Sequence, residues 1–193
     1  MNLIHQERRA RLLAAMKEQE VDVILSWGNA WQSDYLRYVS DYPVLEGDAI
    51  AIVMADGETH LIVEGATEAE RARVKCPDAN VVAADDLIET ARAVLGKLGN
   101  RRVVTAPQSL LPFGLAAENL DRPVDDGTAL LDGLLMTKSP AEIDAMKRSS
   151  ELADRGYQVF RDAAKIGVAE YEMVAEIEGF LRAEGCPENF MLI

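Results

Sequence analysis

The sequence is poor in cysteine and histidine, with two of each among its 193 residues. Cys76 and Cys186 lie far apart, each is followed by a proline, and neither belongs to a CxxC motif or a Cys/His cluster. A disulfide framework and a structural zinc site are therefore disfavoured, and a reducing cytosol is the expected environment. His5 falls on a highly charged helix, where we expect it to face solvent, and His60 with Glu64 supplies only half of a metal site. We predict no metal ligand in this chain.

Basic residues are also scarce, because 20 Lys and Arg stand against 33 Asp and Glu, for a net charge of −13. Such an acidic surface repels phosphate groups, which argues against nucleic acid and anionic membranes as partners. The sequence has no apolar run of membrane-spanning length, and its charged amino terminus lacks the apolar core of a signal peptide. We therefore expect a soluble, cytoplasmic protein.

Motifs that bind cofactors or supply nucleophiles are missing as well. The sequence contains no G-x-G-x-x-G, no phosphate-binding loop and no G-x-S-x-G, and Ser149-Ser150 has no partnering histidine. The pairs Asp85-Asp86 and Asp125-Asp126 fall in expected turns, where capping and solvation explain them better than acid–base catalysis. We predict no catalytic residue in this chain.

Strand and helix patterns alternate over the first 133 residues. Beyond an amphipathic helix at the amino terminus, the expected elements are strands over 21–25, 49–54, 59–64, 80–83 and 102–106, and a helix over 85–98. Asp56-Gly57 supplies the positive φ of a tight hairpin turn between the strands 49–54 and 59–64. This order predicts a three-layer α/β domain with at least one antiparallel hairpin.

Residues 134–193 change to a helical pattern. Ser139, Pro140 and Glu142 are typical of a capped helix start. An apolar stripe follows at steps of three and four residues, and its members are Ile143, Met146, Ser150, Ala153, Tyr157, Phe160 and Ala164. A second helix is expected over 170–184 and a strand over 189–193. The uncovered stripe and the apolar final residues predict that another polypeptide segment completes this region.

Several stretches share their order with one enzyme family. They are the helix 8–18 leading into the strand 21–25, the segment Asp34-Tyr35-Leu36-Arg37-Tyr38, the turn at Asp56-Gly57, the linker 136–143 and the tail 167–190. The second stretch is similar to an Asn-x-x-Tyr-Leu-x-Gly segment, and the linker to Arg-x-Ile-Lys-Ser-x-x-Glu-Ile. Together they resemble the creatinase, prolidase and aminopeptidase P family. The sequence departs from it where the family glycine falls at Tyr38 and the linker arginine at Leu135.

The resemblance implies a creatinase-type N-terminal α/β domain over 1–133 and the start of an incomplete pita-bread catalytic domain over 134–193. It also implies that the family's metal ligands, two aspartates, a histidine and two glutamates, lie beyond residue 193. The histidine proton shuttle of the metal-free creatinases would lie there too. A divalent metal pair would therefore belong to the completed enzyme, with no ligand from this chain.

The aromatic segment 27–46 contains the one candidate binding site. Trp27 and Tyr35 are expected in the core or in an interface. In the family, the loop after the Tyr-Leu segment reaches over the active site of a neighbouring subunit and contacts substrate. By that resemblance, Tyr42, Leu45 and Glu46 are the predicted substrate contacts.

The implied function is that of the N-terminal part or subunit of a hydrolase that cleaves a C–N bond. The substrate would be an Xaa-Pro peptide or a small amide or amidine. Two alternatives stay open: a non-catalytic oligomerisation or regulatory module that retains only the N-terminal domain, and a fragment of a longer protein. The expected partners are further copies of the chain or a complementary C-terminal catalytic subunit.

Overall fold

The computed structural model describes residues 3–116, 120 and 122–186. The chain divides into two compact units, residues 1–138 and 139–193. The boundary expected between residues 133 and 134 falls inside a helix of the first unit, Thr128–Met136, whose Leu130 and Leu131 are buried in that unit. The strand expected over 189–193 lies outside the described residues.

The first unit is built on a six-stranded sheet with the order β4-β3-β2-β1-β5-β6. Its elements are α1 (Leu3–Glu18), β1 (Val23–Asn29), α2 (Asp34–Ser40), β2 (Asp48–Met54), β3 (Thr59–Glu64), α3 (Gly65–Lys75), β4 (Asn80–Ala84), α4 (Leu87–Leu95), β5 (Val103–Thr105), β6 (Val124–Asp126) and α5 (Thr128–Met136), with short 3-10 turns at Gly96–Leu98, Gln108–Leu110 and Phe113–Leu115. Strand β2 runs antiparallel to both neighbours, and the other described pairs are parallel.

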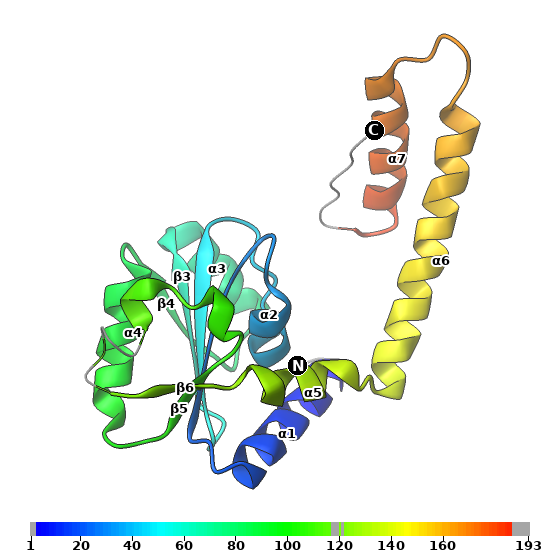
Figure 1. Ribbon diagram of the computed structural model, residues 1–193. Helices are drawn as coiled ribbons and strands as arrows, with labels where there is room; N and C mark the ends of the chain where they lie inside the picture. Colours follow the sequence, from blue (N-terminus) through cyan, green and yellow to red (C-terminus); the bar gives the residue numbers. More distant parts are fainter. Residues whose placement is uncertain (1–2, 117–119, 121, 187–193) are drawn as a thin grey trace. The chain divides into compact units, whose positions relative to one another are not determined.

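Helices cover both faces of this sheet, which confirms the predicted three-layer α/β architecture (Figure 1). Alternate residues of a strand point to opposite faces. In β1, Ile24 belongs to the buried cluster that includes residues of α1, α2, α3 and α5, whereas Val23 and Leu25 belong to the cluster that includes residues of α4. Each inward apolar side chain is therefore buried on one face or the other, and this burial is the main source of the fold's stability.

The hairpin between β2 and β3 confirms the turn predicted at Asp56-Gly57. Gly57 has φ +95°, and its N–H donates to the Met54 carbonyl at 2.8 Å. The Arg9 guanidinium of α1 donates to the Gly57 carbonyl. Gly57 therefore supplies a backbone conformation that side-chain-bearing residues rarely adopt.

Two expectations for the first unit are wrong. His5 does not face solvent: it is 9% exposed, because it lies on the inner side of α1, and burial lowers its pKa. The pair Asp125-Asp126 belongs to the edge strand β6 and not to a turn, because both residues pair in parallel with β5. Asp125 forms an ion pair with Arg102 at 3.2 Å, and Asp126 accepts from the Thr128 N–H at 2.8 Å.

The second unit is a helical hairpin of α6 (Pro140–Ala163) and α7 (Glu170–Ala183). The predicted capping box is present: the Ser139 hydroxyl accepts from the Glu142 N–H, and the Glu142 carboxylate accepts from the Ser139 N–H. Gly156 of α6 is buried against α7, with Leu181 at ordinary contact distance, 3.6 Å, from the position of an added Cβ.

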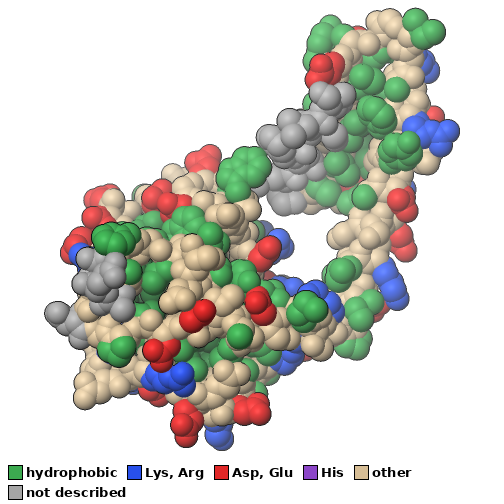
Figure 2. Space-filling view, viewed as in Figure 1, with side chains coloured by type: hydrophobic (Ala, Val, Ile, Leu, Met, Phe, Trp, Pro, Cys, Tyr) green, Lys and Arg blue, Asp and Glu red, His purple; other side chains and the backbone are tan. Residues whose placement is uncertain are grey.

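Much of the apolar surface of this hairpin is open, as Figure 2 shows along α6 and α7. Over residues 139–186, the exposed large apolar side chains are Ile143, Met146, Tyr157, Ile166 and Tyr171. Met146 and Tyr157 belong to the predicted stripe and are 56% and 59% exposed, so α7 covers only part of it. No described helix combines the length and the apolar character needed to cross a membrane.

Candidate functional site

The predicted contacts lie in the segment 41–47, which joins the end of α2 to the start of β2. Asp41 ends α2 in the left-handed conformation, with φ +60°, and its N–H donates to the Arg37 carbonyl at 2.8 Å. Pro43 then prevents the helix from continuing. The segment runs to Gly47, which lies beside the edge of the sheet where β1 and β3 end. In open α/β sheets this edge is the common location of ligand sites.

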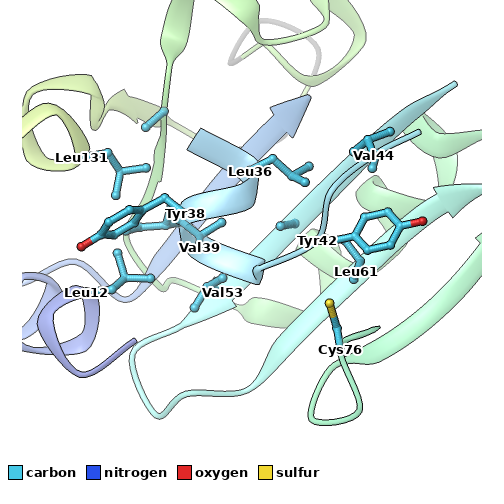
Figure 3. Packing of buried hydrophobic residues seen from close by; sticks show 14 of the residues in the cluster. Leu12, Leu36, Tyr38, Val39, Tyr42, Val44, Val53, Leu61, Cys76 and Leu131 are labelled. Carbon is cyan, nitrogen blue, oxygen red and sulfur yellow. The ribbon is translucent and has the colours of Figure 1, made fainter. Parts of the chain in front are cut away.

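Tyr42 lies inside the molecule and has no exposed surface. Its ring belongs to the core cluster beneath α2 and lies beside Leu61 (Figure 3). Its hydroxyl donates to a carboxylate oxygen of Glu68 on α3, and burial together with this hydrogen bond raises the pKa of Tyr42 far above its ordinary value. Its N–H donates to the Ser40 hydroxyl at 3.2 Å.

Arg71 of α3 connects this tyrosine to the rest of the segment. Its Nη1 donates to Glu68 Oε1 at 2.9 Å, and its Nη2 donates to the Pro43 carbonyl. The guanidinium also lies over the Tyr42 ring, 5.3 Å from the ring centre, in a cation–π contact. Arg71 therefore contacts the Tyr42 ring, the Pro43 backbone and the Glu68 carboxylate at once.

The outer part of the segment is accessible. Leu45 is half-buried and Glu46 is exposed. Gly47 has φ +64°, a backbone conformation that residues with a Cβ rarely adopt, and an added Cβ would also displace the Glu64 carboxylate. The structure thus separates the three predicted contacts: Tyr42 faces the core, whereas Leu45 and Glu46 face outward.

Two cavities lie near the segment. One, of about 460 Å³, lies at the sheet edge and includes Trp27, Asp48 and Glu64 in its lining. The other, of about 390 Å³, is lined by groups of both charges, including Arg9 and Asp41. Neither lining includes Tyr42, Leu45 or Glu46, the predicted substrate contacts.

The remaining candidates have structural partners. His60 Nε2 lies 3.1 Å from Glu58 Oε1, so its partner is not Glu64. Asp86 caps α4 by accepting from the Glu89 N–H at 2.9 Å, as predicted for one residue of that pair. Tyr35 is half-buried, and its hydroxyl donates to Asp132 at 2.6 Å. Tyr38, at the family glycine position, is buried, and Arg8 lies 5.5 Å from its ring centre.

The donor set does not suit a metal pair. Over residues 3–116, 120 and 122–186, no three His, Cys, Asp or Glu side chains gather in a way that could hold a metal ion. The divalent pair implied by the resemblance therefore does not fit this part of the chain.

Sequence reasoning missed Glu68 and Arg71 because it missed α3. The inner face of that helix carries the small residues Ala69 and Ala72, which give a weak apolar periodicity. The spacing of Glu68 and Arg71 by three residues on one helix was the available signal, since such pairs meet on a helix surface.

One protein-family model matches this chain. The family model described as Creatinase/Prolidase N-terminal domain matches residues 8–121. No curated protein matches the sequence.

Solved structures of similar fold include three peptidases. The X-Pro aminopeptidase from Thermotoga maritima has a TM-score of 0.76 at 19% identity, over 93% of this chain and 50% of its own. The Xaa-Pro dipeptidase from Bacillus anthracis has a TM-score of 0.67 at 21% identity, over 95% and 50%. The prolidase from Pyrococcus horikoshii has a TM-score of 0.65 at 18% identity, over 94% and 50%.

The chain spans about half the length of these solved structures. At such identities the likeness shows the fold alone, whereas the family model covers more than half of the chain. The chain therefore belongs to the family of creatinase/prolidase N-terminal domains.

Proposed function

We propose that this chain is the N-terminal part, or an N-terminal subunit, of a hydrolase that cleaves a C–N bond. The substrate class is an Xaa-Pro peptide or a small amide or amidine. The observation that carries the proposal is the match to the Creatinase/Prolidase N-terminal domain over residues 8–121. The structural relatives, which include an Xaa-Pro dipeptidase and an X-Pro aminopeptidase, support the same class.

The catalytic groups of this hydrolase come from another polypeptide segment. The described residues offer no metal-binding group of side chains, and Tyr42 and Cys76, buried with raised pKa values, are poorly suited to acid–base or nucleophilic work at neutral pH. The segment is supplied by a longer form of this chain or by a complementary C-terminal subunit. Association of several copies brings the N-terminal domain of one beside the catalytic centre of another.

In this assembly the segment 41–47 contributes to substrate binding. Leu45 offers an apolar contact and Glu46 a negative charge, and both are accessible. Tyr42 is fully buried, so its contribution passes through the conformation of the segment.

The test is hydrolysis by the protein as it occurs in its source cells. The chain is tagged at its chromosomal position, purified without denaturant and assayed on a glycyl-proline dipeptide and on a small amidine. We expect hydrolysis by the native material and none by the 193-residue chain produced alone. Hydrolysis by the chain alone would place the catalytic residues within these 193 residues, and inert native material would favour the non-catalytic module.

A further inference from the structure

The segment that carries Leu45 and Glu46 has few fixed points of its own. Asp41 is tied to the end of α2, and ladder pairing with β1 begins only at Asp48. Between them, within the part of the chain that the structure describes, residues 43–46 form no backbone–backbone hydrogen bond. A segment of this kind takes its conformation from side-chain anchors.

Val44 anchors the segment by packing into the core, where it is 5% exposed, and the Tyr42 N–H donates to Ser40 of α2. The remaining polar anchors come from α3. The Tyr42 hydroxyl is buried and donates to Glu68, a residue that is 8% exposed and whose carboxylate accepts from Arg71 as well. Arg71 also donates to the Pro43 carbonyl. Tyr42, Glu68 and Arg71 therefore satisfy one another's hydrogen-bonding groups in a region of low solvent access, where an unpaired polar group costs stability.

We propose that Glu68 and Arg71 of α3 are positioning residues, which hold Tyr42 and Pro43 so that Leu45 and Glu46 are presented to substrate. The functional half of this statement rests on the proposed function, and the structural half does not. Glu68 and Arg71 need not touch substrate. They act through the backbone of the segment, and the role of Tyr42 is the same.

Arg71 carries this role better than a lysine would. Its planar guanidinium reaches a carboxylate and a carbonyl at once while lying over an aromatic ring, and an ammonium cannot reproduce this geometry. Arg73, two residues further along α3, is exposed and forms none of these contacts, so it provides a matched control.

The experiment measures the mobility of the segment directly. A nitroxide label is attached at Glu46→Cys in a Cys186→Ser background, where the remaining Cys76 is buried. The electron paramagnetic resonance spectrum is then compared between the parent, Arg71→Met, Tyr42→Phe and the control Arg73→Met. We expect the mobile component to become dominant in Arg71→Met, to rise in Tyr42→Phe and to stay unchanged in Arg73→Met.

Tyr42→Phe removes a single hydroxyl, so it keeps the proposal testable if Arg71→Met fails to fold. An unchanged spectrum in Tyr42→Phe and in a folded Arg71→Met would overturn the proposal, and so would equal mobilisation by Arg73→Met. In the native assembly, Arg71→Met should raise KM about threefold to tenfold, the effect of one hydrogen bond, with kcat unchanged. Mobilisation without any hydrolysis by native material would instead refute the proposed function alone.

Discussion

Cys76 shows how burial sets the chemistry of a single residue. Its thiol is 7% exposed and donates to the Ser40 carbonyl at 3.3 Å, and burial raises its pKa to about 12. The thiolate is the reactive form, so at pH 8 Cys76 holds on the order of 10³ times less thiolate than an ordinary cysteine. Cys186 is more accessible.

We therefore predict that iodoacetamide labels Cys186 of the folded chain much faster than Cys76. Because the pKa of Cys76 is raised, its labelling rate should keep rising about tenfold per pH unit through pH 10, without a plateau. Mass spectrometry of tryptic peptides gives both rates, and urea-unfolded protein is the control, in which both thiols react. Equal labelling in the folded state would contradict the burial of Cys76.

Glu46 is the residue whose predicted role in substrate binding is easiest to isolate. Its side chain is exposed, so Glu46→Gln should change the free energy of unfolding by less than about 0.5 kcal/mol. In the native assembly we expect a higher KM or an altered preference among Xaa-Pro substrates. Glu70→Gln, an exposed carboxylate on α3, is the matched control. Identical kinetics for the two variants would show that Glu46 has no specific role in substrate binding.

At the scale of single residues, the sequence does not reliably predict whether a side chain is buried. His5 is buried although its neighbours are charged, because the inner side of α1 is set by packing against the sheet unit. Tyr42 was predicted as a substrate contact, and it lies in the core with Glu68 and Arg71. That arrangement joins residues 26 positions apart in sequence, and no local pattern indicates it.

At the scale of elements, the correct predictions rest on strong local sequence signals. The β2–β3 hairpin follows from Asp56-Gly57, the start of α6 from Ser139 and Glu142, and the start of α4 from Asp86. Helix α3 buries small residues, and β6 is a three-residue edge strand that ends in two aspartates. Tertiary packing decides both elements, so single-sequence periodicity does not reveal them.

The hairpin gives a test of this reasoning. Gly57→Ala should lower the free energy of unfolding by about 1–3 kcal/mol, because φ +95° is strained for a residue with a Cβ. Gly96→Ala is the control, since Gly96 has φ −61° and no atom lies within 4 Å of an added Cβ. It should be neutral or slightly stabilising, by about 0.4–1 kcal/mol. Urea titration followed by circular dichroism separates the two, and equal losses would show that backbone strain is not the cause.

The cap of α6 gives a second test. Ser139→Ala removes the acceptor for the Glu142 N–H and should destabilise the helix by about 0.5–2 kcal/mol. Ser150→Ala is the control, because Ser150 lies exposed within the same helix and its hydroxyl only donates to the preceding turn. Amide exchange in the first turn of α6 should quicken in Ser139→Ala alone.

At the scale of the whole molecule, the order of the elements is what made the family recognisable. The matches in individual stretches are loose, as the replacement of a glycine by the buried Tyr38 shows, yet the family model covers residues 8–121. The second unit leaves large apolar side chains exposed on α6 and α7. Burial of such side chains contributes about 1.5–3 kcal/mol each, so a covering polypeptide would stabilise this unit considerably.

Catalysis is predicted to require polypeptide beyond these 193 residues, and native mass spectrometry of the active material tests this most directly. The protein tagged in its source cells is fractionated by size, each fraction is assayed on an Xaa-Pro dipeptide, and the active fraction is weighed intact. We predict a mass that is not a multiple of 21.2 kDa, the mass of this 193-residue chain, after allowance for the tag. An active fraction made only of 21.2 kDa chains would contradict the account.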